Sequence, residues 1–146
     1  MEAKFVKRLN RFTALLEKRK EILKAYIPNS GRLEGLLEEG KRCYLVPSKG
    51  KLEYKIVGVK EKDIWVSIDS HLPERAFEGW LNLGLIDHFK NWRIKSRQFH
   101  YKGKRIDFLL KHVRFPKYML LEVKSCTLVK ANTALFPDAP TQRGRE

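Results

Sequence analysis

Turns divide the first seventy residues into short apolar runs, and no run is long enough for more than a short strand. Residues 4–27 carry β-branched and aromatic side chains at close spacing on either side of a charged turn at Lys18 to Lys20, which predicts a β-hairpin. The remaining predicted elements are strands at 43–47, 51–59 and 64–68 and a short helix at 32–40 that ends at Gly40. Five short strands with one small helix predict an oligonucleotide-binding (OB) barrel in residues 1–70.

Four aromatic side chains lie in these predicted strands: Tyr26, Tyr44, Tyr54 and Trp65. On an open barrel face they would stack on the bases of a single strand. Inside the barrel they would instead be ordinary core residues. The sequence leaves both interpretations open.

The pattern changes at His71, where a second domain, residues 71–146, is predicted to begin. Pro73 suits a first helical turn, and Phe77, Trp80 and Leu81 follow at helical spacing. Three strand-like runs come next, at 93–101, 104–112 and 117–129, joined as a meander. Near the end, Thr141 has the character of a helix cap. The predicted fold class is α+β, mostly β, with the barrel followed by a helix-and-sheet domain.

Net charge is the strongest global signal. The chain has 31 Lys and Arg against 17 Asp and Glu, a net charge of +14. Residues 84–146 hold 14 basic and 5 acidic side chains, so most of the excess lies in the second part. A polyanion is the natural partner of such a surface, and we expect DNA, with RNA as a possible competitor. The alternatives are a basic solubilising surface and an anionic membrane, but no basic amphipathic helix supports the membrane.

Eight basic residues are the candidate DNA contacts: Arg8, Arg11, Arg32, Arg93, Lys95, Arg97, Lys104 and Arg105. No stretch approaches the roughly 18 apolar residues of a membrane span. The N-terminus lacks the apolar core of a secretory signal, so a cytoplasmic location is expected. Cys43 and Cys126 each sit in an apolar run and are expected to be reduced core residues.

Two carboxylates occur inside apolar runs of the second domain. Asp107 lies in RIDFLL and Glu122 in MLLEVKS, and a buried charge must be paired or bind a metal. Lys124 follows Glu122 by two residues, so on one strand both would project from the same face. Carboxylates on adjacent strands can hold Mg²⁺ or Mn²⁺, and a neighbouring lysine can balance charge on a phosphate. Glu78, on the predicted helix, is a weaker candidate ligand.

Asp107, Glu122 and Lys124 also have a plainer interpretation as a structural cluster of ion pairs, Asp107 with Arg105 and Glu122 with Lys124. The spacing alone does not decide between a metal site and such a cluster. The strand context, the apolar surroundings and the basic domain favour the metal site.

The chain resembles the sugar fermentation stimulation protein family of bacteria and archaea. The residues that carry the resemblance are FVKRLNRFTALLE at 5–17, IPNSGRLEGLL at 27–37, HLPERAFEGWLNLGLI at 71–86, RIDFLL at 105–110, EVKSCTLV at 122–129 and ALFPDAPTQRGRE at 134–146. The resemblance implies an OB-like N-terminal domain followed by a domain similar to the PD-(D/E)xK nucleases. It further implies a DNA-binding protein linked to the regulation of sugar-utilisation genes. Asp107, Glu122 and Lys124 fall on the nuclease motif.

This chain departs from that family pattern at two places. Glu74 stands where family members usually have Asn, with Asp69-Ser70 in place of a common Asn-Thr. Family members also continue past residue 146, so one sheet face should be apolar and uncovered, in a shortened chain or one completed by a second copy. We therefore expect a largely sequence-independent DNA-binding protein. The alternatives are a Mg²⁺-dependent DNA endonuclease and a structural interaction protein.

Overall fold

The computed structural model describes residues 1–130 and 133–135. These residues fall into two compact units, one made of Met1–Ser70 with the chain from Cys126 onward, the other of His71–Ser125. No helix among the described residues is long and apolar enough to cross a membrane. The predicted cap at Thr141 lies outside the described residues.

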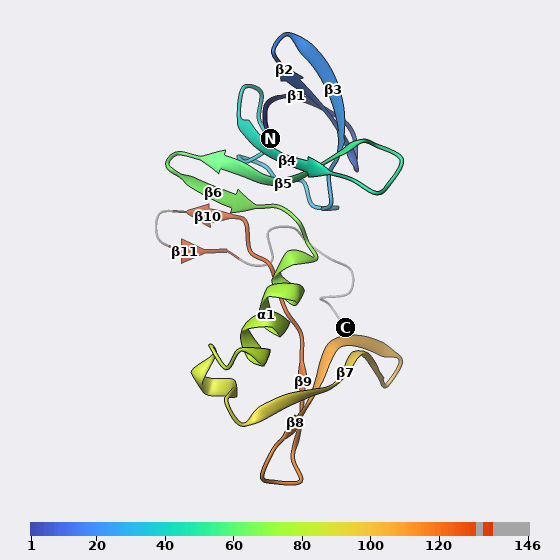
Figure 1. The fold of residues 1–146 in the computed structure, drawn as a ribbon, viewed down its shortest axis with the longest axis vertical. Helices are drawn as coiled ribbons and strands as arrows, with labels where there is room; N and C mark the ends of the chain where they lie inside the picture. The colour runs from blue at the N-terminus through green and yellow to red at the C-terminus, as the bar shows by residue number, and fades with distance from the viewer. Residues whose placement is uncertain (131–132, 136–146) are drawn as a thin grey trace. The chain divides into compact units, whose positions relative to one another are not determined.

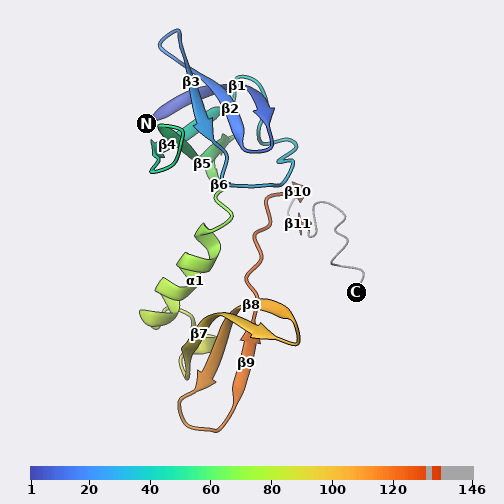
Figure 2. The same ribbon diagram turned by 90° about the vertical axis from the view of Figure 1, so that its right-hand side faces the viewer.

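The first unit is built on a closed barrel (Figures 1 and 2). Its strands are β1 Glu2–Asn10, β2 Thr13–Lys18, β3 Glu21–Tyr26, β4 Arg42–Pro47, β5 Tyr54–Glu61 and β6 Ile64–Ser67. Their order is β3-β2-β1-β4-β5-β6, and a parallel pairing of β3 with β5 closes the first five. The OB-like five-stranded barrel is therefore confirmed, with β6 outside it as the hairpin partner of β5.

The strand boundaries differ from the prediction at the start of the chain. The hairpin predicted in residues 4–27 is a three-stranded meander, because a second turn falls at Arg11 and Phe12. The side chain of Asn10 makes this turn by accepting a 2.9 Å hydrogen bond from the Phe12 amide. Two bulges bend β1 between Phe5 and Asn10. Such bends let one long strand pair with β2 and β4 around a closed barrel.

The prediction of a helix at 32–40 was wrong. The segment forms turns instead, because Leu33 has a left-handed φ of 57° and Gly35 and Gly40 have φ of 77° and 82°. A helix cannot pass through such residues. Leu33 and Leu36 are nevertheless buried in the barrel core, so the turns serve to bring apolar side chains into it.

Alternating strand residues fill the barrel. Phe5, Leu16, Leu45 and Ile56 are almost fully buried, as the two-residue period of a strand requires. Cys43 belongs to this core, which confirms the prediction made for it, and burial raises the pKa of its thiol to about 12. Cys126 is exposed, so its predicted core position was wrong.

The second unit packs one helix on a three-stranded antiparallel sheet. Its elements are α1 Leu72–Asn82, the short 3₁₀ helix η1 Asp87–Phe89, β7 Trp92–Tyr101, β8 Lys104–His112 and β9 Tyr118–Leu121. Strand order is β7-β8-β9. The core is small: Leu81 of α1 packs with Phe108 and Leu110 of β8. Two short strands, β10 Val129–Lys130 and β11 Thr133–Ala134, pair outside this sheet.

The face of the β7-β8-β9 sheet away from this core is apolar. Leu109 and Leu120 alternate along their strands with core residues, and with Tyr101 and Tyr118 they line a groove of about 330 Å³. Tyr118 is 52% exposed and Leu120 is 41% exposed. That a second copy of the chain covers this face stays a prediction.

Candidate functional site

Asp107 and Glu122 lie side by side at the end of the β8–β9 ladder. The last paired residues are Phe108 and Leu121, so the next positions bring the two acidic residues together. The Asp107 amide donates a 3.2 Å hydrogen bond to Glu122 Oε2. In return, the Val123 amide donates a 2.8 Å hydrogen bond to Asp107 Oδ2. The structure thus joins two carboxylates that are far apart in the chain.

The strand context predicted for Glu122 and Lys124 was wrong in one respect. Strand β9 ends at Leu121, so both residues lie beyond it. The reason is local, since the Val123 amide bonds to the Asp107 side chain rather than to a backbone carbonyl of β8. The carboxylates are also less buried than expected: Asp107 is half-buried and the Glu122 side chain is 37% exposed. The pair therefore faces solvent rather than the core.

Lys124 pairs with Glu122, its Nζ lying 2.5 Å from Oε1. This is one of the two ion pairs of the structural interpretation. The other, Asp107 with Arg105, is not among the ion pairs of the described chain. Asp107 Oδ1 accepts no hydrogen bond from any described residue. One oxygen of the half-buried Asp107 carboxylate is thus left for another ligand.

Glu78 is held by Arg97 instead of joining this pair. Arg97 Nε lies 3.0 and 2.9 Å from the two carboxylate oxygens of Glu78, and Nη2 adds a further contact. These hydrogen bonds lower the pKa of Glu78 and raise that of Arg97. Within residues 1–130 and 133–135, no three His, Cys, Asp or Glu side chains gather closely enough to hold a metal ion. Glu78 therefore does not complete a three-ligand set.

Residues 97 and 98 of β7 both bond to α1, which an ordinary strand does not allow because successive side chains point to opposite faces. Gln98 Nε2 donates a 2.6 Å hydrogen bond to Glu74 Oε1, next to the Arg97–Glu78 pair. Gln98 has φ of 49°, a left-handed conformation that turns the strand at this point. The register places Gln98 opposite Asp107. A backbone kink thus lies beside the acidic pair.

Asp107 and Glu122 fit a hard divalent cation in chemical type. Mg²⁺ is commonly bound through one or two carboxylates with water and phosphate oxygens completing its octahedron. The Asp107 oxygen that accepts no hydrogen bond from described residues and the exposed Glu122 carboxylate meet that need. The two-carboxylate part of the predicted Mg²⁺ or Mn²⁺ site is therefore compatible with the residues present.

Arg8, predicted to contact DNA, has another role. Each of its five N–H groups donates to a backbone carbonyl. The acceptors are Asn10, Arg11, Asn29, Gly31 and Arg32, at 2.6 to 3.3 Å. Burial, followed by the charge of Arg11, lowers the pKa of Arg8. The side chain ties the β1–β2 turn to the loop after β3 and has no N–H left for a phosphate.

The other predicted DNA contacts differ in how free they are. Intramolecular partners occupy Arg11 (Ser30 carbonyl), Arg32 (Glu34), Arg93 (Lys90 and Trp92 carbonyls), Lys95 (Tyr118 ring) and Arg97 (Glu78). Lys104 and Arg105 are exposed and have no hydrogen-bond or ion-pair partner in the described chain. They lie at the tip of the β7–β8 hairpin, three and two residues before Asp107.

A cluster of basic residues on the barrel is not among the sites predicted from the sequence. Lys4, Arg19, Lys20 and Arg42 line one hollow, although they come from three separate segments. The charged run at 18–20 is the available signal in the sequence, but by itself it predicts only a turn. Of the four aromatic candidates, Tyr44 and Trp65 are exposed, whereas Tyr26 and Tyr54 are half-buried.

The fold and the site define a two-domain protein in which an OB-like barrel precedes a helix-and-sheet unit that carries paired carboxylates and a lysine. The chain belongs to the sugar fermentation stimulation protein family. The model of the "SfsA N-terminal OB domain" matches residues 6–68, and that of the "Sugar fermentation stimulation protein RE domain" matches residues 71–146.

Relatives and a solved structure agree with that assignment. Sugar fermentation stimulation protein homologs of Moorella thermoacetica and Desulforamulus reducens are 38% and 40% identical over 99% of this chain. The structure of Pyrococcus furiosus SfsA in complex with Ca²⁺ is similar with a TM-score of 0.88 and 30% identity over 99% of this chain. This chain spans 63% and 60% of those two homologs and 62% of the solved chain.

Proposed function

We propose that the protein is a largely sequence-independent DNA-binding protein that acts in the cytoplasm. The observation that carries the proposal is the β7–β8 hairpin tip, where Lys104 and Arg105 are exposed and unpaired within the described chain, next to Lys102. Free cations of this kind neutralise phosphates and release counterions, which gives affinity without reading bases. The net charge of +14 supports the same conclusion. An effect on sugar-utilisation genes, to which the relatives' name points, would follow from such binding.

The test is the salt dependence of duplex binding, measured by fluorescence anisotropy with a labelled duplex of arbitrary sequence. We expect log K to fall linearly with log salt, by about 0.9 per phosphate contact. The double variant Lys104→Ala/Arg105→Ala should lower that slope by about one to two units. Lys90→Ala is the matched control, because Lys90 is already paired with Asp87 at 2.8 Å. A flat salt response of the unaltered protein would contradict the proposal.

A second function, a divalent-cation-dependent DNA endonuclease, is favoured by the Asp107–Glu122 pair and by the Ca²⁺ named for the Pyrococcus furiosus structure. Asp107 and Glu122 would hold the cation through carboxylate oxygens. A bound Mg²⁺ or Mn²⁺ would supply an activated water and neutralise charge on the phosphate. Lys124 would keep its ammonium group beside the phosphate, where negative charge develops.

Cleavage is tested on supercoiled plasmid with Mn²⁺. We expect nicked or linear DNA with the unaltered protein and intact DNA with Glu122→Gln. Asp87→Asn is the control, since Asp87 is an exposed acidic residue of the same unit that pairs only with Lys90 among described ion pairs. Equal cutting by both variants would show that the cleavage does not depend on Glu122 and would contradict the proposed site. Retarded but uncut DNA throughout would leave DNA binding as the function of this chain.

A further inference from the structure

The β2–β3 turn holds two cations in a backbone conformation that does not suit them. Lys18 pairs with Glu21, so Arg19 and Lys20 alone form the turn, with φ of 52° and 70°. A two-residue turn with both φ values positive is a type I′ turn, which favours Asn-Gly. Left-handed conformations are unfavourable for side chains of this kind. The sequence therefore keeps two exposed positive charges at this tip at a conformational cost, a combination that points to a binding role.

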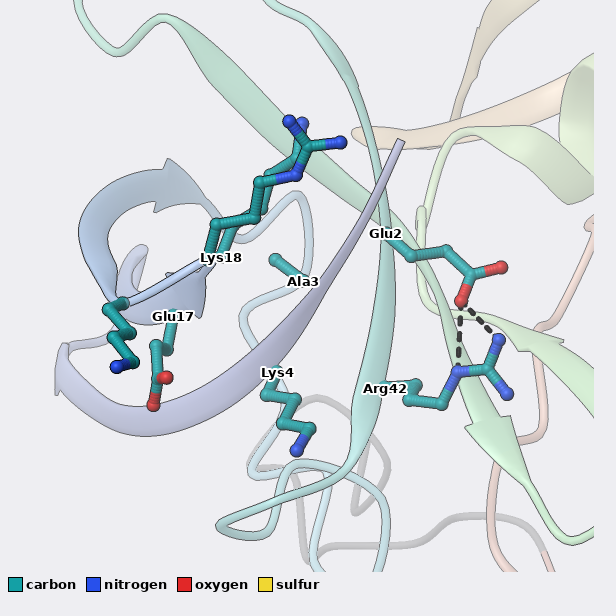
Figure 3. Close-up of a pocket in the computed structure, with 8 residues that line it drawn as sticks. Glu2, Ala3, Lys4, Glu17, Lys18 and Arg42 are labelled. Atoms are coloured by element: carbon teal, nitrogen blue, oxygen red, sulfur yellow. Dashed lines mark hydrogen bonds and ion pairs between the residues drawn. The ribbon is translucent and has the colours of Figure 1, made fainter.

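These two residues border a hollow of about 370 Å³ that is also lined by Glu2, Ala3, Lys4, Glu17, Lys18 and Arg42. Figure 3 shows this hollow. Five of its lining side chains are basic, namely Lys4, Lys18, Arg19, Lys20 and Arg42, and two are acidic. The register aligns Glu17 of β2, Lys4 of β1 and Arg42 of β4 in one row across the sheet. Arg42 bonds to Glu2 through Nε at 2.9 Å and through Nη2. This exposed pair holds weakly, so Arg42 can turn to a phosphate at little cost.

An exposed aromatic pair adjoins the hollow. Tyr44 lies two residues after Arg42 on β4 and opposite Glu2 on β1. Its ring meets that of Trp65 edge to face, with centroids 5.9 Å apart. Lys60 Nζ lies 5.5 Å from the Trp65 ring centroid. Tyr44 is 44% exposed and Trp65 is 41% exposed.

Gly58 of β5 is a neighbour of both rings. A Cβ atom at residue 58 would come within 3.7 Å of the Trp65 ring and 3.5 Å of the Val66 carbonyl oxygen. Tyr44 also pairs with Gly58 across the β4–β5 ladder. Strand β5 thus lies between the two strands that carry the rings, with no side chain at residue 58. Exposed aromatic rings of this kind are suited to stacking on unpaired bases.

We propose that the hollow and the aromatic pair form one binding track for single-stranded DNA, with phosphates at Lys4, Arg19, Lys20 and Arg42 and an unpaired base on Trp65. The inference rests on the proposed DNA-binding function and names a site for it. Basic grooves beside aromatic platforms are how proteins hold single strands without sequence preference. From β2 across β1, β4 and β5 to β6 the track spans on the order of 19 Å, enough for a few nucleotides. A duplex keeps its base faces stacked and cannot use Trp65.

The alternative binding site for a single strand is the usual ligand face of an OB barrel, here called the rival face. OB barrels commonly take ligands on the second and third strands and the first turn. Here that region carries Phe12 with the Arg11 guanidinium 5.5 Å above its ring, and Tyr26 with its centroid 6.3 Å from that of Phe12. Arg8, at the base of that turn, has no free N–H. The proposed track instead runs from the β2–β3 turn across β1, β4 and β5 to β6.

The first experiment measures anisotropy of a fluorescein-labelled oligo-dT of about 12 nucleotides, a length within the site sizes of OB folds. Trp65→Ala should weaken binding roughly 5- to 30-fold, the effect of losing one stacked base. Trp65→Tyr should restore most of it. Trp80→Ala is the control, because Trp80 is also exposed, at 54%, but lies on α1. Affinity for a duplex of the same length should not change with Trp65.

The second experiment compares two charge-matched double variants. Arg19→Asn/Lys20→Gly should lower the salt slope of oligo-dT binding by about 1.4, or about 0.7 for each phosphate contact. It should also raise the thermal midpoint, which separates lost contacts from lost folding. Arg11→Ala/Lys24→Ala, which alters the rival face, should change the slope less. An unchanged affinity in Trp65→Ala, or a larger loss in the Arg11/Lys24 variant, overturns the track and leaves DNA binding in place. No binding of either DNA form by the unaltered protein overturns both proposals.

Discussion

Asp107 and Glu122 are linked by two hydrogen bonds, each between a backbone amide and a carboxylate oxygen. The Asp107 amide lies 3.2 Å from Glu122 Oε2, and the Asp107 carboxylate in turn holds the amide that follows Glu122. Each carboxylate therefore fixes the chain that carries the other. The arrangement holds two carboxylates next to each other, as the proposed cation site requires.

Asp107→Asn should abolish Mn²⁺ binding while leaving the fold intact. The amide oxygen can still accept the Val123 hydrogen bond, but the residue loses the charge that a hard cation needs. Isothermal titration calorimetry with Mn²⁺ measures the loss, and Asp87→Asn serves as the control. Equal Mn²⁺ uptake by the unaltered protein and Asp107→Asn would place the cation elsewhere.

Glu78→Gln should destabilise the protein at neutral pH and have little effect at low pH. The hydrogen bonds from Arg97 lower the pKa of Glu78 from its ordinary value of 4.5. A lowered folded-state pKa means stability that is present above 4.5 and lost as pH falls through the folded value. Urea unfolding at pH 7 and at pH 3 measures the two differences. A difference that grows on acidification would contradict the assigned direction.

Arg8→Lys should cost about 2–4 kcal/mol of unfolding free energy, because lysine has three N–H groups and cannot serve all the carbonyls that the guanidinium holds. Arg93→Lys is the matched control, since Arg93 bonds only to carbonyls within three residues of itself. Its effect should stay below about 0.5 kcal/mol. Similar losses in the two variants would show that charge, and not the five-way contact, is what Arg8 supplies.

Arg19→Asn/Lys20→Gly should stabilise the chain by about 1–2 kcal/mol, because both left-handed positions are relieved and no buried contact is removed. Thermal unfolding monitored by circular dichroism measures the gain. As the control, Lys24→Ala removes an exposed charge from the strand that follows and should leave the midpoint almost unchanged. A lower midpoint in the double variant would mean that these two side chains stabilise the barrel.

One thiol should react with Ellman's reagent in the folded protein and two in denaturant. Burial raises the pKa of Cys43 to about 12 and removes it from solvent, whereas Cys126 is exposed. Cys126→Ser should leave no fast-reacting thiol. Two fast thiols in the native protein would show that the barrel core opens readily.

The strands were predictable where alternation and turn residues coincide. The barrel, the helix at 72–82 and the β7–β8 hairpin could be predicted for that reason. The turn at Arg11 and Phe12 could not, because it contains no Gly or Pro and is made by the Asn10 side chain. At Leu33 the sequence predicts a helix that the structure lacks, because the left-handed backbone of this residue interrupts a segment with good helical composition.

The site was predictable as a set of residues but not as a geometry. The pairing of Asp107 with Glu122 followed from the meander, yet the end of β9 depends on a bond between a side chain and an amide. Such a bond has no signature in hydrophobic periodicity. The role of Arg8 was equally hidden, because three of its acceptors are 21 to 24 residues away in sequence.

The closure of the barrel rests on a short joint. Only Ala25 with Tyr54 and Tyr26 with Lys55 pair across β3 and β5, whereas every other neighbouring pair of barrel strands shares a longer ladder. A barrel closed by so short a strand pairing can open between β3 and β5 and keep its other hydrogen bonds. The lowest-energy local opening of the barrel is then expected to break the β3–β5 pairing alone. Amide hydrogen exchange at the β3–β5 seam should therefore be faster than exchange in β1 and β2. Such local opening would separate β3 from β5 and flatten the barrel into an open sheet, while the strands stay paired with their other neighbours.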